Sequence, residues 1–293
     1  ASEHQAADEL LRDADLAMHR AKRLGGARWD LFDQAMHASA FQRMSVESDI
    51  RKSLLENRFV VHYQPIVDLH SGRISGFEAL VRWNRHDKGL VYPNDFIPIA
   101  EDTGLIIPLD LWVMREACRT LNAWHDDFPR EQPLTISINL STRLFSLANL
   151  AEQVRDILVE TGVNPAAVRL EITETMAMSD ADRALQLLTD LKALGVQLSI
   201  DDFGTGYSSL NYLHRIPANV LKIDRSFVSQ MHDSEECLQI IRTIMLLARN
   251  LGMRVIAEGP ETHEHVERLV SLDCDYGQGY FFSKPVAEDQ ARH

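Results

Sequence analysis

Short apolar runs and amphipathic helical patterns alternate along most of this chain of 293 residues. Successive runs begin roughly 25 to 35 residues apart, which is typical of strand–helix units joined into a parallel sheet. Because such units need helices on the faces of the sheet, the alternation predicts an α/β fold. The runs that we interpret as parallel strands are 134–140, 167–173, 196–200, 220–224, 253–258 and 274–282.

The first two apolar runs, 58–69 and 74–83, are joined differently from the others. Only four residues, 70–73, separate them, which is too short for a helical crossover, so these strands are antiparallel. Together with the six later runs they make eight strands. We therefore expect a TIM-type (β/α)8 barrel with its first strand antiparallel, in preference to an open doubly wound sheet or two smaller domains.

Composition and charge exclude several classes of protein. No run of about 18 apolar residues is present, so we expect no membrane segment in this chain. The net charge of −13 disfavours a nucleic-acid polymer as partner, whereas a small phosphorylated ligand is compatible if metal ions supply positive charge. Cys118, Cys237 and Cys274 form no paired motif, which favours free thiols and a cytoplasmic location, whether or not a longer parent is membrane-anchored.

Nearly every predicted strand ends in a polar side chain. A single acid at such a position commonly caps the next helix. In a barrel, however, the carboxyl ends of the strands lie on one face, where active sites form, and seven strands with this pattern favour a functional site. The polar residues are Glu78, Asn139, Glu171, Glu174, Asp201, Asp202, Lys222, Asp224, Glu258, Glu261 and Gln278.

The chemistry of these side chains indicates divalent cations. Several carboxylates in one barrel mouth repel one another unless cations neutralise them. Carboxylate and amide oxygens, without Cys or His, favour Mg²⁺ or Mn²⁺ over Zn²⁺. Asp201 and Asp202, adjacent at one strand end, are suited to bridging two ions in a site for phosphoryl displacement.

A lysine at a barrel strand end is compatible with two kinds of chemistry, and the surroundings of Lys222 distinguish between them. A Schiff-base lysine, as in aldolases, needs a neutral amine, which desolvation or a neighbouring cation provides. The acids predicted around Lys222 favour the charged ammonium instead. We therefore favour a role in orienting water or stabilising phosphate charge over the aldolase-like alternative.

The same residues resemble the EAL-type cyclic-di-GMP phosphodiesterases over about residues 45–290. The motif that names the family is Glu78-Ala79-Leu80, and eight further motifs occur in the family's order, among them YQPIVDL, SINLS, LEITET, DDFGTGYSSL and GQGYFFSKP. The resemblance implies hydrolysis of one phosphodiester bond of cyclic di-GMP, which yields linear pGpG, with two Mg²⁺ or Mn²⁺ ions. It also implies a homodimer with contacts through the DDFGTGYSSL loop.

The resemblance assigns roles to particular residues. It implies that Lys222 and Glu258 position or deprotonate the attacking water, and that Glu174 holds the loop after Asp202. Pro260 stands where the family usually has Val, which places the aim of Glu258 in question. The implied metal ligands are Glu78, Asn139, Glu171, Asp201 and Asp202, with Asp201 shared between the ions. The implied substrate contacts are Gln64, Leu80, Arg82, Glu261 and Gln278.

The front of the chain has its own resemblance. Residues 1–38 are similar to the C-terminal end of a GGDEF-type diguanylate cyclase domain, although the signature motif of that domain is absent, so we expect no cyclase activity. Residues 39–56 form a connector helix in this interpretation, and 57–293 the barrel. The alternative function is a cyclic-di-GMP receptor or regulatory module that does not hydrolyse its ligand.

Overall fold

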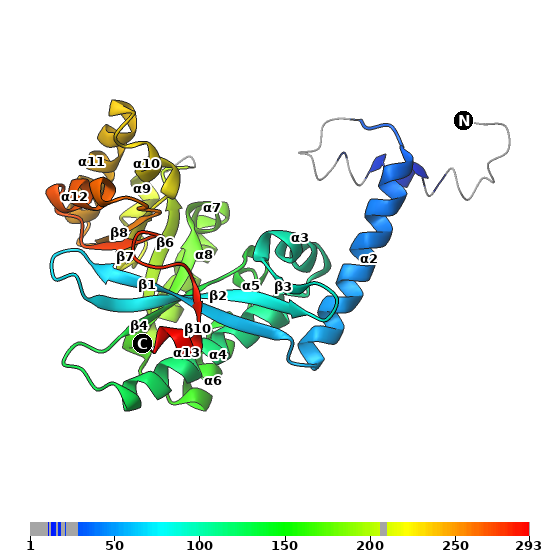
Figure 1. Cartoon of the computed structure of the whole chain (residues 1–293), viewed down its shortest axis with the longest axis horizontal. Coiled ribbons are helices and arrows are strands. Elements are labelled where there is room, and N and C mark those ends of the chain that lie inside the picture. The colour runs from blue at the N-terminus through cyan, green and yellow to red at the C-terminus, as the bar shows by residue number, and fades with distance from the viewer. Residues whose placement is uncertain are drawn as a thin grey trace.

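The computed structural model describes residues 29–205 and 210–292, together with a few positions between 11 and 21. Eight strands form a closed barrel in the order β1-β9-β8-β7-β6-β5-β4-β2, and β2 pairs with β1 to complete the ring (Figure 1). β1 is antiparallel to both neighbours and the remaining pairs are parallel, which confirms the predicted barrel. The strands are β1 (Phe59–Asp68), β2 (Ile74–Arg85), β4 (Thr135–Asn139), β5 (Val168–Thr173), β6 (Gln197–Phe203), β7 (Val220–Ile223), β8 (Arg254–Glu258) and β9 (Tyr276–Gln278).

Two short strands lie outside the ring. β3 (Gly89–Val91) pairs with the outer end of β2, and β10 (Val286–Ala287) pairs with β1. β9 is shorter than the predicted run 274–282 because the chain turns at Gly279. There the backbone passes so close to Pro260 that an added Cβ would lie 2.3 Å from the Pro260 carbonyl oxygen.

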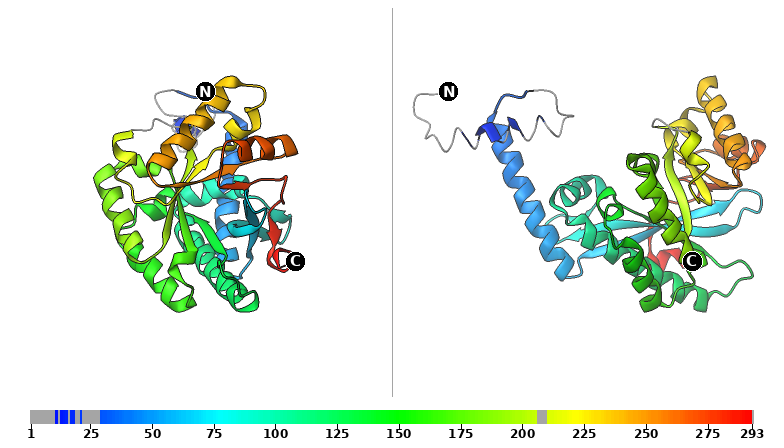
Figure 2. Two further views of the ribbon diagram at one scale, coloured as in Figure 1. Left: turned by 90° about the vertical axis from the view of Figure 1, so that its left-hand side faces the viewer. Right: turned by 180° about the vertical axis from the view of Figure 1, so that it is seen from behind.

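Helices surround the barrel on the outside, as the views in Figure 2 show. The apolar face of α4 (Ile106–Asp127) is buried, with Met114 and Trp124 among the core residues. Gly104 and Gly162 adopt positive φ and end α3 and α6 with left-handed caps. The helices after α2 are α3 (Pro93–Thr103), α4 (Ile106–Asp127), α5 (Thr142–Phe145), α6 (Leu150–Thr161), η1 (Pro165–Ala167), α7 (Glu174–Ser179), α8 (Ala181–Ala193), α9 (Leu210–Leu213), α10 (Arg225–Gln230), α11 (Glu235–Asn250), α12 (His263–Ser271) and α13 (Glu288–Ala291).

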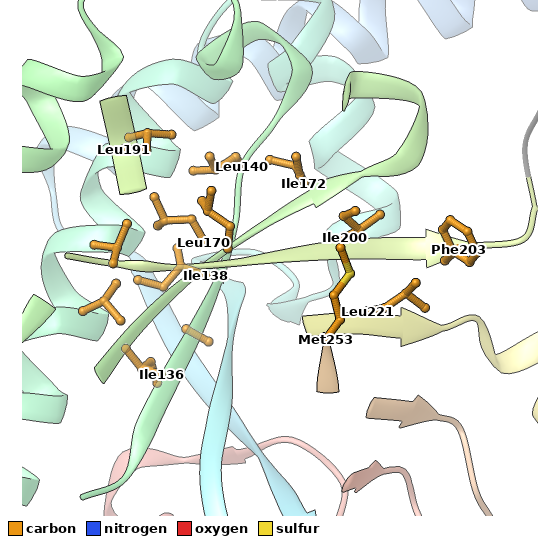
Figure 3. Close-up of a cluster of buried hydrophobic side chains, with 14 of the residues drawn as sticks. Ile136, Ile138, Leu140, Leu170, Ile172, Leu191, Ile200, Phe203, Leu221 and Met253 are labelled. Atoms are coloured by element: carbon orange, nitrogen blue, oxygen red, sulfur yellow. The ribbon is translucent and has the colours of Figure 1, made fainter. Parts of the chain in front are cut away.

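Strand alternation separates the apolar core from the barrel interior. Leu170, Ile200 and Leu221 belong to the large buried cluster between the strands and the helices (Figure 3). Their neighbours in the chain, such as Glu171 and Lys222, point to the opposite side of the sheet because successive side chains alternate. In these strands the apolar side chains of the cluster therefore face the helices, and the polar side chains between them face the barrel interior.

The connector helix α2 spans Gln34–Leu55 and projects from one side of the barrel (Figures 1 and 2). It begins at residue 34, before the predicted start at 39. Its C-terminal half is docked by the fully buried Ile50 and by a hydrogen bond from Trp83 Nε1 to Ser53 Oγ of 2.9 Å. Most of residues 1–38 lie outside the described residues, so the GGDEF-type segment stays a prediction. In the described part of the chain, no helix has the length and apolar character of a membrane span.

Candidate active site

The carboxyl ends of the barrel strands bring the predicted polar residues to one face. In the strand register, Asn139 of β4 lies beside Glu171 of β5, and Glu258 of β8 lies beside Gln278 of β9. Asn139 Nδ2 donates a hydrogen bond of 2.6 Å to Oε1 of Glu78 on β2. Glu78 and Gln278, which are 200 positions apart in the sequence, thus meet within one small volume.

Lys222 is the centre of this cluster and is completely buried. Its Nζ lies 2.6 Å from Glu258 Oε1, 2.7 Å from Glu171 Oε2, 3.4 Å from Asp201 Oδ1 and 3.7 Å from Glu78 Oε2. Burial lowers the pKa of Lys222, but the four carboxylates outweigh it and raise that pKa well above its ordinary value. The amine is therefore a charged ammonium, which opposes the aldolase-like alternative.

Two of the carboxylates around Lys222, those of Glu171 and Glu258, have strongly raised pKa values. Burial raises the pKa of Glu171 to about 7 and the pKa of Glu258 to about 8. Lys222 lowers both pKa values, whereas the negative charges of Asp201 and Glu78 raise them further. One ammonium does not balance this many buried acids, so the cluster favours additional cations near neutral pH.

Asp201 and Asp202 reach the same site although they are adjacent in a strand. Strict alternation would direct them to opposite faces of the sheet. The β6–β7 register instead shifts between Ile200 and Phe203, and Asp202 adopts a left-handed φ of 53°. This bulge lets oxygens of Asp201, Asp202 and Glu258 lie within 4.8 Å of one another.

The glutamate that follows β5 supports the loop after these aspartates. Glu174 is buried at the start of α7, and its Oε2 accepts a hydrogen bond of 3.2 Å from the Gly204 N–H. Thr205 Oγ1 donates to the carbonyl oxygen of Asp202 and tightens the same turn. This hydrogen bond links Glu174 to the loop after Asp202, and its role in holding that loop stays a prediction. Residues 206–209 lie outside the described residues, so the predicted dimer contact through this loop stays a prediction.

The donor atoms at this face fit divalent cations. Among the described residues, Oε1 of Glu171 and Oε1 of Gln278 are buried without a hydrogen-bond partner. A buried acceptor without a donor is costly, and a bound cation would satisfy it. The predicted ligands Glu78, Asn139 and Glu171 are gathered around Lys222, while Asp201 and Asp202 lie toward the opening with Glu258. Oxygen donors without Cys or His suit Mg²⁺ or Mn²⁺.

These pKa shifts predict how stability depends on pH without metal. Glu171 and Glu258 bind protons more tightly in the folded chain than the ordinary carboxyl pKa of 4.5 implies for the unfolded chain. The free energy of unfolding should therefore fall as pH rises from about 5 to about 8, by on the order of 3 kcal/mol. Added Mn²⁺ should restore stability more at pH 8 than at pH 5, because protons and cations compete for the same oxygens.

Urea denaturation in EDTA and in Mn²⁺, at pH 5 and pH 8, measures both effects. The Glu258→Gln variant removes one titrating group and should flatten the metal-free profile. Stability that rises with pH in EDTA would contradict the assignment of these two buried acids.

The predicted substrate contacts fall into two groups. Gln64 joins the cluster, because it accepts a hydrogen bond of 3.2 Å from Gln278 Nε2 and donates one of 3.1 Å to the Ser283 carbonyl oxygen. Gln278 Nε2 also donates to Glu78 Oε2. The second group, Leu80, Arg82 and Glu261, makes no hydrogen bond or ion pair with this cluster in the described part of the chain.

Within this second group, only Arg82 is deeply buried. Leu80 is half-buried and lies opposite His62 in the β1–β2 register. Glu261 is exposed between β8 and α12, where its backbone N–H donates 3.2 Å to His265 Nδ1. The structure therefore leaves the Glu261 side chain outside the buried cluster, because the chain turns away from the barrel after Glu258.

Pro260 does not turn Glu258 out of the site. Gly259 adopts a φ of 75° and donates its N–H to the Gln278 carbonyl oxygen at 2.8 Å, while Phe281 N–H donates to the Pro260 carbonyl oxygen at 3.1 Å. These bonds fasten the segment after β8 to the segment after β9. Glu258 keeps its contact with Lys222.

Two residues near the site were not assigned a role from the sequence. Asp224 acts electrostatically on Asp202 and also caps α10 by accepting the Ser226 N–H at 2.9 Å. Tyr92 places its ring against Arg82, with the guanidinium carbon 5.3 Å from the ring centroid. The sequence contains one signal for Tyr92. It is an aromatic residue directly before Pro93, at a position where a polar helix-capping residue is usual.

Comparison with known proteins establishes the family. The family model described as "EAL domain" matches residues 47–285. The chain belongs to the EAL domain family. Its EAL domain extends from the second half of α2 to the segment before β10, and so includes every barrel strand.

Two curated relatives from Pseudomonas aeruginosa match this EAL domain and its front segment. One is "Bifunctional diguanylate cyclase/cyclic di-GMP phosphodiesterase MucR", 42% identical over 98% of this chain and 42% of its own length. The other is "Cyclic di-GMP phosphodiesterase NbdA", 39% identical over 95% of this chain and 35% of its own length. The chain thus spans less than half the length of either relative.

Solved structures agree with the EAL domain fold. "PaMucR Phosphodiesterase, c-di-GMP complex" matches with a TM-score of 0.81 and 41% identity over 84% of this chain and 99% of that one. "Structure of EAL Enzyme Bd1971 - cAMP and cyclic-di-GMP bound form" matches with a TM-score of 0.83 and 34% identity over 99% of this chain and 76% of that one. The first of these neighbours was solved with cyclic di-GMP, and the second with cAMP and cyclic di-GMP.

Proposed function

We propose that this EAL domain is a phosphodiesterase that hydrolyses cyclic di-GMP to linear pGpG, with two Mg²⁺ or Mn²⁺ ions as cofactors. The observation that carries the proposal is the group of Asp201, Asp202 and Glu258 oxygens within 4.8 Å of one another, next to the buried Lys222 ammonium. Relatives with phosphodiesterase names and a neighbour solved with cyclic di-GMP support the choice of substrate.

The residues of the chain divide the chemistry among them. Bound divalent cations would supply charge that stabilises the phosphate in the transition state and would lower the pKa of water. Glu258, whose pKa is raised to about 8, is matched to accepting a proton from water near neutral pH. Lys222 holds Glu258 in place through their contact of 2.6 Å. Glu78, Asn139, Glu171, Asp201 and Asp202 would hold the cations.

Substrate binding would use the rim of the same face. Arg82 carries a guanidinium suited to a phosphate oxygen, and Gln64 is fixed by Gln278 and Ser283. Leu80 and Glu261 would contact the substrate from the half-buried and exposed parts of the rim. The acidic net charge is compatible with an anionic substrate because the cations face its phosphates. A homodimer and a cytoplasmic location are further parts of this proposal.

A single assay separates hydrolysis from the receptor alternative. The purified chain is incubated with cyclic di-GMP and Mn²⁺, with and without EDTA, and the nucleotides are resolved by chromatography. We expect pGpG with Mn²⁺, a loss of at least about a hundredfold in rate with EDTA, and recovery when excess Mn²⁺ is restored. If intact cyclic di-GMP binds, as titration calorimetry would detect, but no pGpG forms, the chain is a receptor and the hydrolase proposal fails.

A further inference from the structure

Arg82 is a buried guanidinium without a balancing anion. It is 6% exposed, and Nη1 donates 2.8 Å to the Val81 carbonyl oxygen. In the described part of the chain it forms no ion pair with a carboxylate, and its buried Nε has no hydrogen-bond partner. A buried cation that lacks an ion pair is costly unless an anion arrives. The free Nε edge is the edge that phosphate oxygens use in a bidentate contact.

Tyr92 covers this guanidinium and is held there by strand pairing. Val91 of β3 pairs with Trp83 of β2, so Tyr92 follows at the level of Arg82. The guanidinium carbon lies 5.3 Å from the Tyr92 ring centroid, within the range of a cation–π contact. The ring covers one side of the guanidinium, and Nε, which has no hydrogen-bond partner, stays free for a ligand.

The position of Tyr92 is unfavourable for the helix that it precedes. Tyr92 is the N-cap residue of α3, its side chain makes no capping hydrogen bond, and it is 57% exposed. Ser, Thr, Asp or Asn at this position would stabilise the helix through a capping hydrogen bond. A residue that lowers helix stability and is not part of the core indicates a function at that site.

We propose that Tyr92 is a positioning residue for the substrate, because its ring holds the Arg82 guanidinium with the Nε edge toward a phosphate of the dinucleotide. This inference rests on the proposed function and adds to it a residue outside the buried cluster. Glu78, Tyr280 and Tyr92 all act electrostatically on Arg82. Without the ring, Arg82 would keep its charge and lose its fixed orientation.

The first test compares Tyr92→Ser with Tyr92→Phe. Tyr92→Ser removes the ring but supplies a capping hydroxyl, so the melting temperature should not fall. We expect its KM for cyclic di-GMP to rise about tenfold, while kcat stays within about twofold of the wild-type value. The reason is that Arg82 contacts the phosphate both in the bound substrate and in the transition state, so the loss of its fixed orientation weakens both equally. Tyr92→Phe keeps the ring face and should recover most of this KM. Leu90→Ser, at an exposed site of β3, is the matched control.

A double-mutant cycle with Arg82→Gln decides whether Tyr92 acts through Arg82. We expect Tyr92→Ser to raise KM no further once Arg82 is replaced. An equal tenfold effect in both backgrounds would overturn the proposal, because Tyr92 would then act without Arg82. If the wild-type chain shows no turnover, the proposed function has failed by itself. The proteins of the same cycle are then compared by their Kd for cyclic di-GMP, measured by calorimetry. A Kd that Tyr92→Ser leaves unchanged in the Arg82→Gln background supports the proposal, and an equal effect in both backgrounds overturns it.

Discussion

Asp201→Asn should lower the rate of cyclic di-GMP hydrolysis in Mn²⁺ by about a thousandfold or more, equivalent to about 4 kcal/mol in the activation barrier. The substitution keeps the size of the side chain and removes the charge that would be shared between two cations. It also leaves an oxygen that can accept the Asp202 N–H, which lies 2.9 Å from Asp201 Oδ1. Initial rates of pGpG formation, measured by chromatography over a range of Mn²⁺ concentrations, test this expectation.

The folded structure should survive the Asp201→Asn change. Lys222 keeps three other carboxylates within 4.0 Å, and one source of repulsion within the acidic cluster disappears. We therefore expect the metal-free melting temperature to be equal to or above that of the wild type, and the stabilisation by Mn²⁺ to be largely lost. Asp156→Asn, on an exposed surface of α6, should change neither quantity. Full activity of Asp201→Asn at saturating Mn²⁺ would exclude a bridging role for this residue.

Lys222→Met should be the most destabilising substitution at the site when metal is absent. It removes the ammonium that lies within 4.0 Å of four carboxylates and leaves those acids buried without their cation. Breaking a buried ion pair in this way costs about 3–5 kcal/mol. We expect that loss in urea denaturation at pH 8 in EDTA, together with a fall in hydrolysis of about a hundredfold or more with Mn²⁺.

The pH dependence identifies the cause of the Lys222→Met effect. Without the ammonium, the pKa values of Glu171 and Glu258 should rise further above about 7 and about 8, so both groups stay neutral at pH 5. The destabilisation should therefore be small at pH 5 and large at pH 8. Lys192→Met, which removes a half-buried lysine near Asn219, is the matched control and should show little pH dependence. An equal loss at both pH values would point to packing rather than charge.

The sequence predicted the barrel well because its signals are local. The signals are helical spacing, strand-like runs and the four-residue connection 70–73, and each depends on residues close together in the chain. Together they are compatible with few arrangements of the strands in a sheet. The end of β9 was predicted too long, because the turn at Gly279 depends on the approach of Pro260 from another segment. The start of α2 was placed too late, since the helical pattern there is weak and end positions vary.

The role of Tyr92 could not be inferred from sequence for a similar reason. Its neighbour Arg82 is ten residues earlier, and only the β2–β3 pairing places the ring over the guanidinium. For Glu261, the motif predicted a substrate contact; the fold leaves its side chain exposed, and that contact stays a prediction. Contacts between side chains on different segments are set by register and turns, which periodicity does not specify.

By itself, the sequence determined an eight-stranded α/β barrel with acids and one lysine at its strand ends, because strand and helix periodicities are properties of neighbouring residues. Only the tertiary structure decided which of these groups meet. The closure of the ring surrounds Lys222 with acids from β2, β5, β6 and β8. The bulge in β6, with Asp202 in a left-handed conformation, brings two adjacent aspartates to one face, which regular strand alternation would separate.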